Sequence, residues 1–99
     1  MKQPASAPMP YQLLFTESYL RIAVHFLRRH PDLTRQYGKT LALLEANPHH
    51  PCLRLHAVAG RHQGLHSVSI NLSYRITLEL VIRDRVIIPI NVGDHEAVY

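Results

Sequence analysis

Residues 67–80 read SVSINLSYRITLEL, and this stretch decides the fold class. Apolar residues alternate with polar residues along it, so the two kinds of side chain point to opposite faces of an extended chain. This period of two predicts half-buried β-strands with one dry face and one wet face. Residues 71–73 predict a turn inside the stretch, and Arg83-Asp84-Arg85 predicts a second turn before a strand over 86–92. Pro89 lacks an amide proton, so we expect it at an edge or a bulge.

Two helices are predicted before these strands. Tyr11 to Phe15 read as a short first strand, after which Thr16 can cap a helix by accepting a hydrogen bond from a first-turn amide. The spacing predicts one buried stripe on this helix, made of Leu20, Ala23, Val24 and Leu27.

A second helix is predicted from about Pro31 to Ala46, and Asn47-Pro48 ends it. Its apolar residues Leu33, Tyr37, Leu41 and Leu44 follow helical spacing. The element order is therefore β-α-α-β-β-β. We expect an α+β fold in which a two-helix hairpin packs on an antiparallel sheet.

Length and composition indicate one globular domain. The chain has 99 residues, of which 46% are hydrophobic and 18% charged, and we assign residues 1–8 to a flexible tail and 9–99 to the domain. It has no apolar run near the ~20 residues needed to cross a bilayer, so we expect no membrane partner. The single cysteine, Cys52, fits a reducing cytoplasm and is interpreted as an inert thiol. The net charge of +4 favours a polyanion or an acidic protein as partner, although a solvated basic surface would look the same.

Arg75 is the main candidate for chemistry in the strand region. It alternates with the apolar Tyr74 and Ile76, so we expect its side chain on the wet face. A guanidinium with imidazoles around it suits binding of a phosphate and stabilisation of the charge that builds during phosphodiester cleavage. A cross-strand pair with Glu79 or another acid would explain Arg75 equally well. The nearby candidates are His56, Arg61, His62, His66, Ser69 and Ser73.

The final residues 93–99 carry a second set of candidates. His95 and Tyr99 are four positions apart, so one helical turn would place both on the same side. Both side chains can move protons during catalysis. The alternative is a tail whose tyrosine packs as an apolar plug.

Metal binding is not expected, although the chain has eight histidines. His49-His50 and His62-x3-His66 have possible ligand spacing, but no cysteine pair or HExxH frame accompanies them.

Four stretches resemble the RelE/ParE superfamily of type II toxins, especially its RelE and YafQ branch. They are residues 53–56 (LRLH), the Gly60-x3-Gly64-Leu65 loop, 67–76 (SVSINLSYRI) and 92–99 (VGDHEAVY). The resemblance implies an endoribonuclease that cuts mRNA on the ribosome without a metal or other cofactor and is neutralised by a cognate antitoxin. It also implies that the antitoxin covers the basic sheet face or displaces the final turn.

The resemblance implies roles for single residues. His56 and His95 match histidines of the YafQ branch, and Tyr99 matches a RelE tyrosine that orients the nucleophile or stacks a base. Arg75 matches the arginine that stabilises the phosphate. Arg61, His62 and His66 are then expected to bind RNA.

Two departures from the family pattern leave other functions open. The YafQ strand histidine and aspartate fall on Ser69 and Ser73, and the usual loop lysines are missing. A catalytically weakened homologue that mainly binds its antitoxin is therefore an alternative. A ParE-like gyrase inhibitor is another, because a fold does not determine a function.

Overall fold

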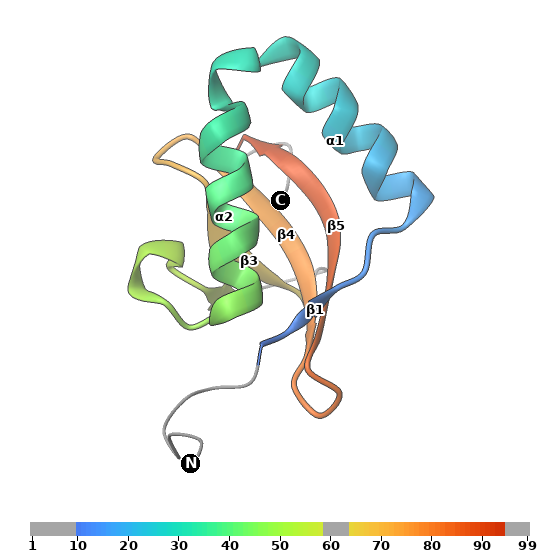
Figure 1. The fold of residues 1–99 in the computed structure, drawn as a ribbon, viewed down its shortest axis with the longest axis vertical. Coiled ribbons are helices and arrows are strands. Elements are labelled where there is room, and N and C mark those ends of the chain that lie inside the picture. The colour runs from blue at the N-terminus through green and yellow to red at the C-terminus, as the bar shows by residue number, and fades with distance from the viewer. Residues whose placement is uncertain (1–9, 59–63, 95–99) are drawn as a thin grey trace, which may run out of the picture.

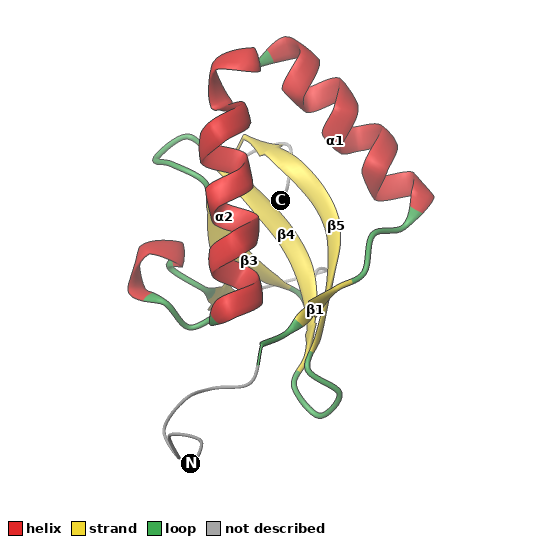
Figure 2. Cartoon of the chain, viewed as in Figure 1, coloured by secondary structure: helices red, strands yellow, loops and turns green. Residues whose placement is uncertain are grey.

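The alternating stretch forms two paired strands, β3 (His66–Ser69) and β4 (Tyr74–Val81), with a turn at 70–73 between them. The computed structural model describes residues 10–58 and 64–94, so the predicted tail 1–8 lies outside it. Figures 1 and 2 show the helices on one side of the sheet. The predicted α+β class is confirmed. The remaining elements are β1 (Gln12–Leu13), α1 (Glu17–Arg29), a 3₁₀ turn (Pro31–Leu33), α2 (Thr34–Ala46), a second 3₁₀ turn (Pro51–Leu53), β2 (His56–Ala57) and β5 (Val86–Asp94).

The sheet has five strands in the order β1-β5-β4-β3-β2. Three strand pairs are antiparallel: β5 with β4, β4 with β3, and β3 with β2. The edge strand β1 pairs parallel to β5, so the sheet is mixed. The predicted order is kept, and the structure adds β2 at one edge.

Pro89 lies at a bulge. Thr77 pairs with Asn91 and Leu78 pairs with Pro89, so Ile90 is an extra residue in β5. The bulge relieves the ladder where the proline has no proton to donate. The predicted position of Pro89 at a bulge is thus confirmed.

The start of α1 follows the prediction, but its buried face does so only in part. Thr16 Oγ1 accepts a hydrogen bond from the Tyr19 amide at 3.0 Å and caps the helix. The predicted stripe is wrong at Leu20 and Val24, because each is 47% exposed. The prediction is confirmed at Ala23, which is buried, and Leu27 is half-buried against the core. Tyr19 and Phe26 are the other buried residues of the helix. Burying the aromatic rings of Tyr19 and Phe26 removes more apolar surface from water than burying Leu20 and Val24 would.

The second predicted helix is confirmed, with its first turn tightened. Residues 31–33 form the 3₁₀ turn, and α2 follows directly from Thr34. Tyr37 and Leu44 are buried, and the predicted Leu33 and Leu41 are half-buried against the same core.

The core lies between the helices and one face of the sheet. Ile76, Leu78 and Val92 belong to the same buried cluster as Tyr19 and Leu44. Because side chains alternate along a strand, the helices cover the face that carries Ile76. The other face carries the polar positions of β3 and β4.

A buried tyrosine pair joins the two helices. The hydroxyl groups of Tyr19 and Tyr37 are 2.6 Å apart, and both side chains are buried. Burial raises the pKa of Tyr19 well above its ordinary value, and the neighbouring Tyr37 hydroxyl adds to the shift. Burial raises the pKa of Tyr37 as well, against the opposing effect of its hydrogen bond with Tyr19. Both hydroxyls therefore stay neutral and share one hydrogen bond.

We expect Tyr19→Phe or Tyr37→Phe alone to lower the free energy of unfolding by about 1–3 kcal/mol, because each leaves the other hydroxyl buried without its partner. The double variant should lose less than the sum of the two single losses, since it removes both polar groups. Urea unfolding of all four proteins measures this coupling. Strictly additive losses would show that the two hydroxyls do not depend on each other.

Candidate functional site

A row of polar side chains crosses the sheet on the face away from the helices. The register pairs one residue from each of four strands, and residues paired across an antiparallel sheet point to the same face. The row consists of His56, Ser67, Thr77 and Asn91.

Arg75 lies next to this row on the same face. It pairs with Ser69 on β3 and with Gly93 on β5, two positions along β4 from Thr77. The sequence left open a pair between Arg75 and Glu79. Within residues 10–58 and 64–94, the structure records no ion pair for Arg75.

Two polar atoms at this place are buried and have no hydrogen-bond partner among the described residues. They are Nη1 of Arg75 and Oγ of Ser67, which occupy diagonal positions on neighbouring strands. Leaving a donor buried and unpaired costs about 1–3 kcal/mol, more for a charged group, and native proteins usually avoid it. An acceptor such as a phosphate oxygen would relieve this cost at Arg75.

His56 is placed to act as a base at the edge of the row. Its side chain is exposed, and Nδ1 lies 3.1 Å from the Arg54 carbonyl oxygen. A carbonyl oxygen only accepts, so Nδ1 donates and the neutral ring carries its lone pair on Nε2. His56 and Arg75 are two strands and two residues apart, or about 12 Å between Cα atoms. Their side chains can therefore reach one substrate from two sides.

His66 does not share this face. It starts β3, pairs with Leu78 and alternates with Ser67, so its side chain points to the side that carries Val68. In the described part of the chain, Nδ1 of its half-buried ring has no hydrogen-bond partner. The structure therefore separates His66 from Arg75, although the sequence grouped them.

Four of the predicted site residues, Arg61, His62, His95 and Tyr99, lie outside the described residues. β5 ends at Asp94, which pairs with Tyr74, and the preceding Gly93 pairs with Arg75. The strand that leads toward His95 thus ends beside Arg75.

Ser69 and Ser73, where the family resemblance leads us to expect acid–base groups, both take part in the β3–β4 turn. Ser69 donates its hydroxyl to the Asn71 carbonyl oxygen at 2.8 Å. The amide of Ser73 donates to the Asn71 side-chain oxygen at 2.8 Å, which places Ser73 in the turn. Ser69 faces Arg75 as expected from the alternation, but it holds backbone there.

Ser67, Thr77 and Asn91 complete the polar row and were missed by sequence reasoning. A signal was available, because Ser67 and Thr77 are polar positions of the alternating stretch 67–80. Asn91 is the one polar residue in the 86–92 stretch VIIPINV. Only the cross-strand register shows that the three lie side by side.

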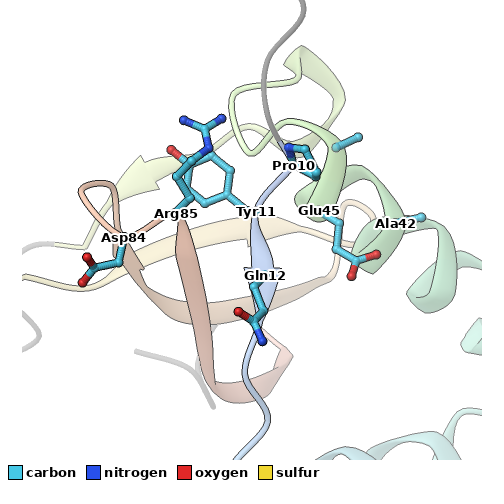
Figure 3. Close-up of a pocket in the computed structure, with 8 residues that line it drawn as sticks. Pro10, Tyr11, Gln12, Ala42, Glu45, Asp84 and Arg85 are labelled. Atoms are coloured by element: carbon cyan, nitrogen blue, oxygen red, sulfur yellow. The ribbon is translucent and has the colours of Figure 1, made fainter.

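A separate hollow of about 690 Å³ lies at the other end of the sheet (Figure 3). The Arg85 guanidinium lies over the Tyr11 ring, 4.7 Å from its centroid. Glu45 and Asp84 also line it, and their carboxylates would repel a phosphate. β4 runs from Arg75 to Val81 between the two places, a distance of about 20 Å. None of the predicted site residues lines this hollow.

Among the described residues, no cluster of three or more histidine, cysteine, aspartate or glutamate side chains could hold a metal ion. No helix in residues 10–58 and 64–94 has the length and apolar character to span a membrane. Cys52 is exposed and forms no disulfide.

The fold is similar to solved toxin structures. YafQ from E. coli strain BL21(DE3) has a TM-score of 0.74 and 14% identity, covering 90% of this chain and 98% of YafQ. The E. coli DinJ–YafQ toxin–antitoxin complex has a TM-score of 0.72 and 16% identity, covering 91% and 98%. The RelBE2 toxin–antitoxin complex from Mycobacterium tuberculosis has a TM-score of 0.65 and 15% identity, covering 87% and 99%.

No family model and no curated protein matches the sequence. The comparison therefore rests on structural similarity alone, and at 14–16% sequence identity this similarity establishes the fold. The chain has the RelE-like fold of the YafQ and RelBE2 toxins.

Proposed function

We propose that this protein is the toxin of a type II toxin–antitoxin system and an endoribonuclease that cuts mRNA on the ribosome without a metal. The observation that carries the proposal is the buried Nη1 of Arg75, which has no hydrogen-bond partner within residues 10–58 and 64–94 and lies on the sheet face away from the helices. It lies beside a polar row in a fold shared with YafQ. A fixed cation at such a place suits the phosphate of an RNA backbone.

The proposed reaction is attack of a ribose 2′-hydroxyl on the adjacent phosphate. The O2′–P bond forms and the P–O5′ bond breaks, leaving a 2′,3′-cyclic phosphate and a 5′-hydroxyl. Arg75 stabilises the charge that builds on the phosphate oxygens. Nε2 of His56 accepts a proton, and we assign the remaining proton transfer and substrate positioning to His95 and Tyr99. The basic residues Arg61 and His62 are proposed to contact RNA outside the reacting phosphate, whereas His66 points to the helix side of the sheet and is not included.

The partners follow from this proposal. DinJ–YafQ and RelBE2 are toxin–antitoxin complexes, and we infer a cognate antitoxin for this chain. Action on translating ribosomes would place the protein in the cytoplasm.

Primer extension on mRNA from translating ribosomes tests the proposal. Purified protein should introduce new 5′ ends within the reading frame, and the cuts should persist in excess EDTA. Absence of cleavage on translating ribosomes would reject the endoribonuclease. Impaired growth with trapped gyrase–DNA complexes and no mRNA cleavage would instead indicate the ParE-like activity.

A catalytically weakened toxin that mainly binds its antitoxin is the second candidate. Ser69 faces Arg75 where the YafQ branch has a histidine, and its hydroxyl is held by the turn. A serine hydroxyl does not titrate near neutral pH, so Ser69 cannot replace a histidine in proton transfer. Growth unimpaired by expression without antitoxin, with antitoxin binding intact, would favour this candidate.

A further inference from the structure

The outer side of α1 carries an apolar and basic surface that the fold does not use. Leu20 and Val24 are each 47% exposed there. A hollow of about 430 Å³ is lined by five residues of this side, which we call the outer α1 face: Leu20, Arg21, Val24, His25 and Arg28. The opposite side of the helix is the one that buries Tyr19, Ala23 and Phe26.

Positive charge runs along the outer α1 face. Arg21, His25 and Arg28 are spaced by four and three residues, so they form one ridge beside Leu20 and Val24. In the described part of the chain, the structure records no ion pair for Arg21 or Arg28. Glu17, at the N-terminal end of α1, is the only acidic residue of this helix. The surface is therefore cationic along most of its length.

This combination selects one kind of partner. An apolar strip beside a cationic ridge matches a helix with an apolar stripe and flanking carboxylates. RNA would pair with the cations but leave Leu20 and Val24 in water. A second copy of this chain would bring its own cationic ridge against the first. α1 has 13 residues and is about 20 Å long, enough to seat several turns of a partner helix.

We propose that the outer α1 face docks an acidic amphipathic helix of a partner protein. That the partner is the antitoxin rests on the proposed toxin function. α1 packs on β5 from the helix side of the sheet (Figure 1), whereas Arg75 points to the other side. The docked helix therefore anchors the partner without touching the Arg75 face. This differs from the expectation that the antitoxin covers the basic sheet face.

Fluorescence anisotropy with a synthetic peptide tests the docking site. The probe is a labelled helical peptide of about 21 residues, with leucines at the a and d positions of three heptads and glutamates beside them. The wild-type protein should bind it, and binding should weaken with salt. Arg21→Glu/Arg28→Glu should weaken binding by about tenfold or more, because two attractive contacts become repulsive. Leu20→Gln/Val24→Gln should weaken it by a similar factor.

Matched controls separate a specific site from general charge attraction. Arg35→Glu/Lys39→Glu makes the same charge change on exposed positions of α2 and should alter binding by no more than about twofold. A peptide with lysines in place of the glutamates should not bind. Circular dichroism confirms that each variant is folded.

Two results would overturn the docking site. One is an acidic peptide that fails to bind or binds the outer-face variants as tightly as wild type. The other is loss of affinity for a single-stranded RNA oligonucleotide in Arg21→Glu/Arg28→Glu, which would make this an RNA surface. Absence of mRNA cleavage in wild type and variants alike would reject the proposed function and leave the peptide result standing.

Discussion

Arg75→Ala should lower the rate of mRNA cleavage by about 10²–10³-fold, the usual cost of removing one group that stabilises charge in a transition state. The loss should appear mainly in kcat, because the charge on the phosphate grows as the O2′–P bond forms. Arg75→Lys should recover only part of the rate, since an ammonium group lacks the planar fork of a guanidinium. Single-turnover cleavage of ribosome-bound mRNA measures these changes.

The stability of the same variant separates catalysis from folding. Within the described residues, Arg75 has no recorded hydrogen bond or ion pair to lose. We therefore expect the free energy of unfolding to stay the same or to rise by up to about 1–3 kcal/mol, because the variant removes a buried donor that has no recorded partner. Arg83→Ala is the matched control, because Arg83 is exposed in the β4–β5 turn at the far end of β4. Equal loss of cleavage in both variants would show that general positive charge, and not the position of Arg75, matters.

Ile76→Ala should produce the largest loss of stability. Ile76 is 0% exposed in the central strand and packs in the cluster shared by the helices and the sheet. Truncating a buried isoleucine to alanine costs about 2–5 kcal/mol, because the lost apolar contacts leave a cavity. In a domain of this size, that shifts the unfolding midpoint temperature by roughly 10 °C or more.

Ile82→Ala provides the comparison for this second variant. Ile82 is 61% exposed, in the turn after β4, and its truncation should change the free energy of unfolding by less than about 0.5 kcal/mol. Urea unfolding of both variants measures the difference. Similar losses in the two would mean that the core does not lie between α1, α2 and the Ile76 face.

The alternation at 67–80 was enough to predict β3, β4 and the turn between them. It was enough because hydrophobic burial acts on a local period that the backbone imposes on every strand. The same local reasoning placed the helix cap at Thr16, since a capping hydroxyl acts on an amide three residues away. α1 shows its limit. The residues that the helix buries have helical spacing just as the predicted stripe does, and only the contact of Phe26 with Tyr74, 5.4 Å between ring centroids, shows which side the sheet covers.

The candidate site also has one part that the sequence predicts and one part that only the tertiary structure shows. The sequence alone determined that Arg75 alternates with apolar neighbours, and hence that it points away from the core. Only the tertiary structure decided that Ser67, Thr77 and Asn91 lie beside it and that His66 points to the other side. Alternation is a property of one strand, whereas register depends on long-range pairing between strands that no local pattern encodes.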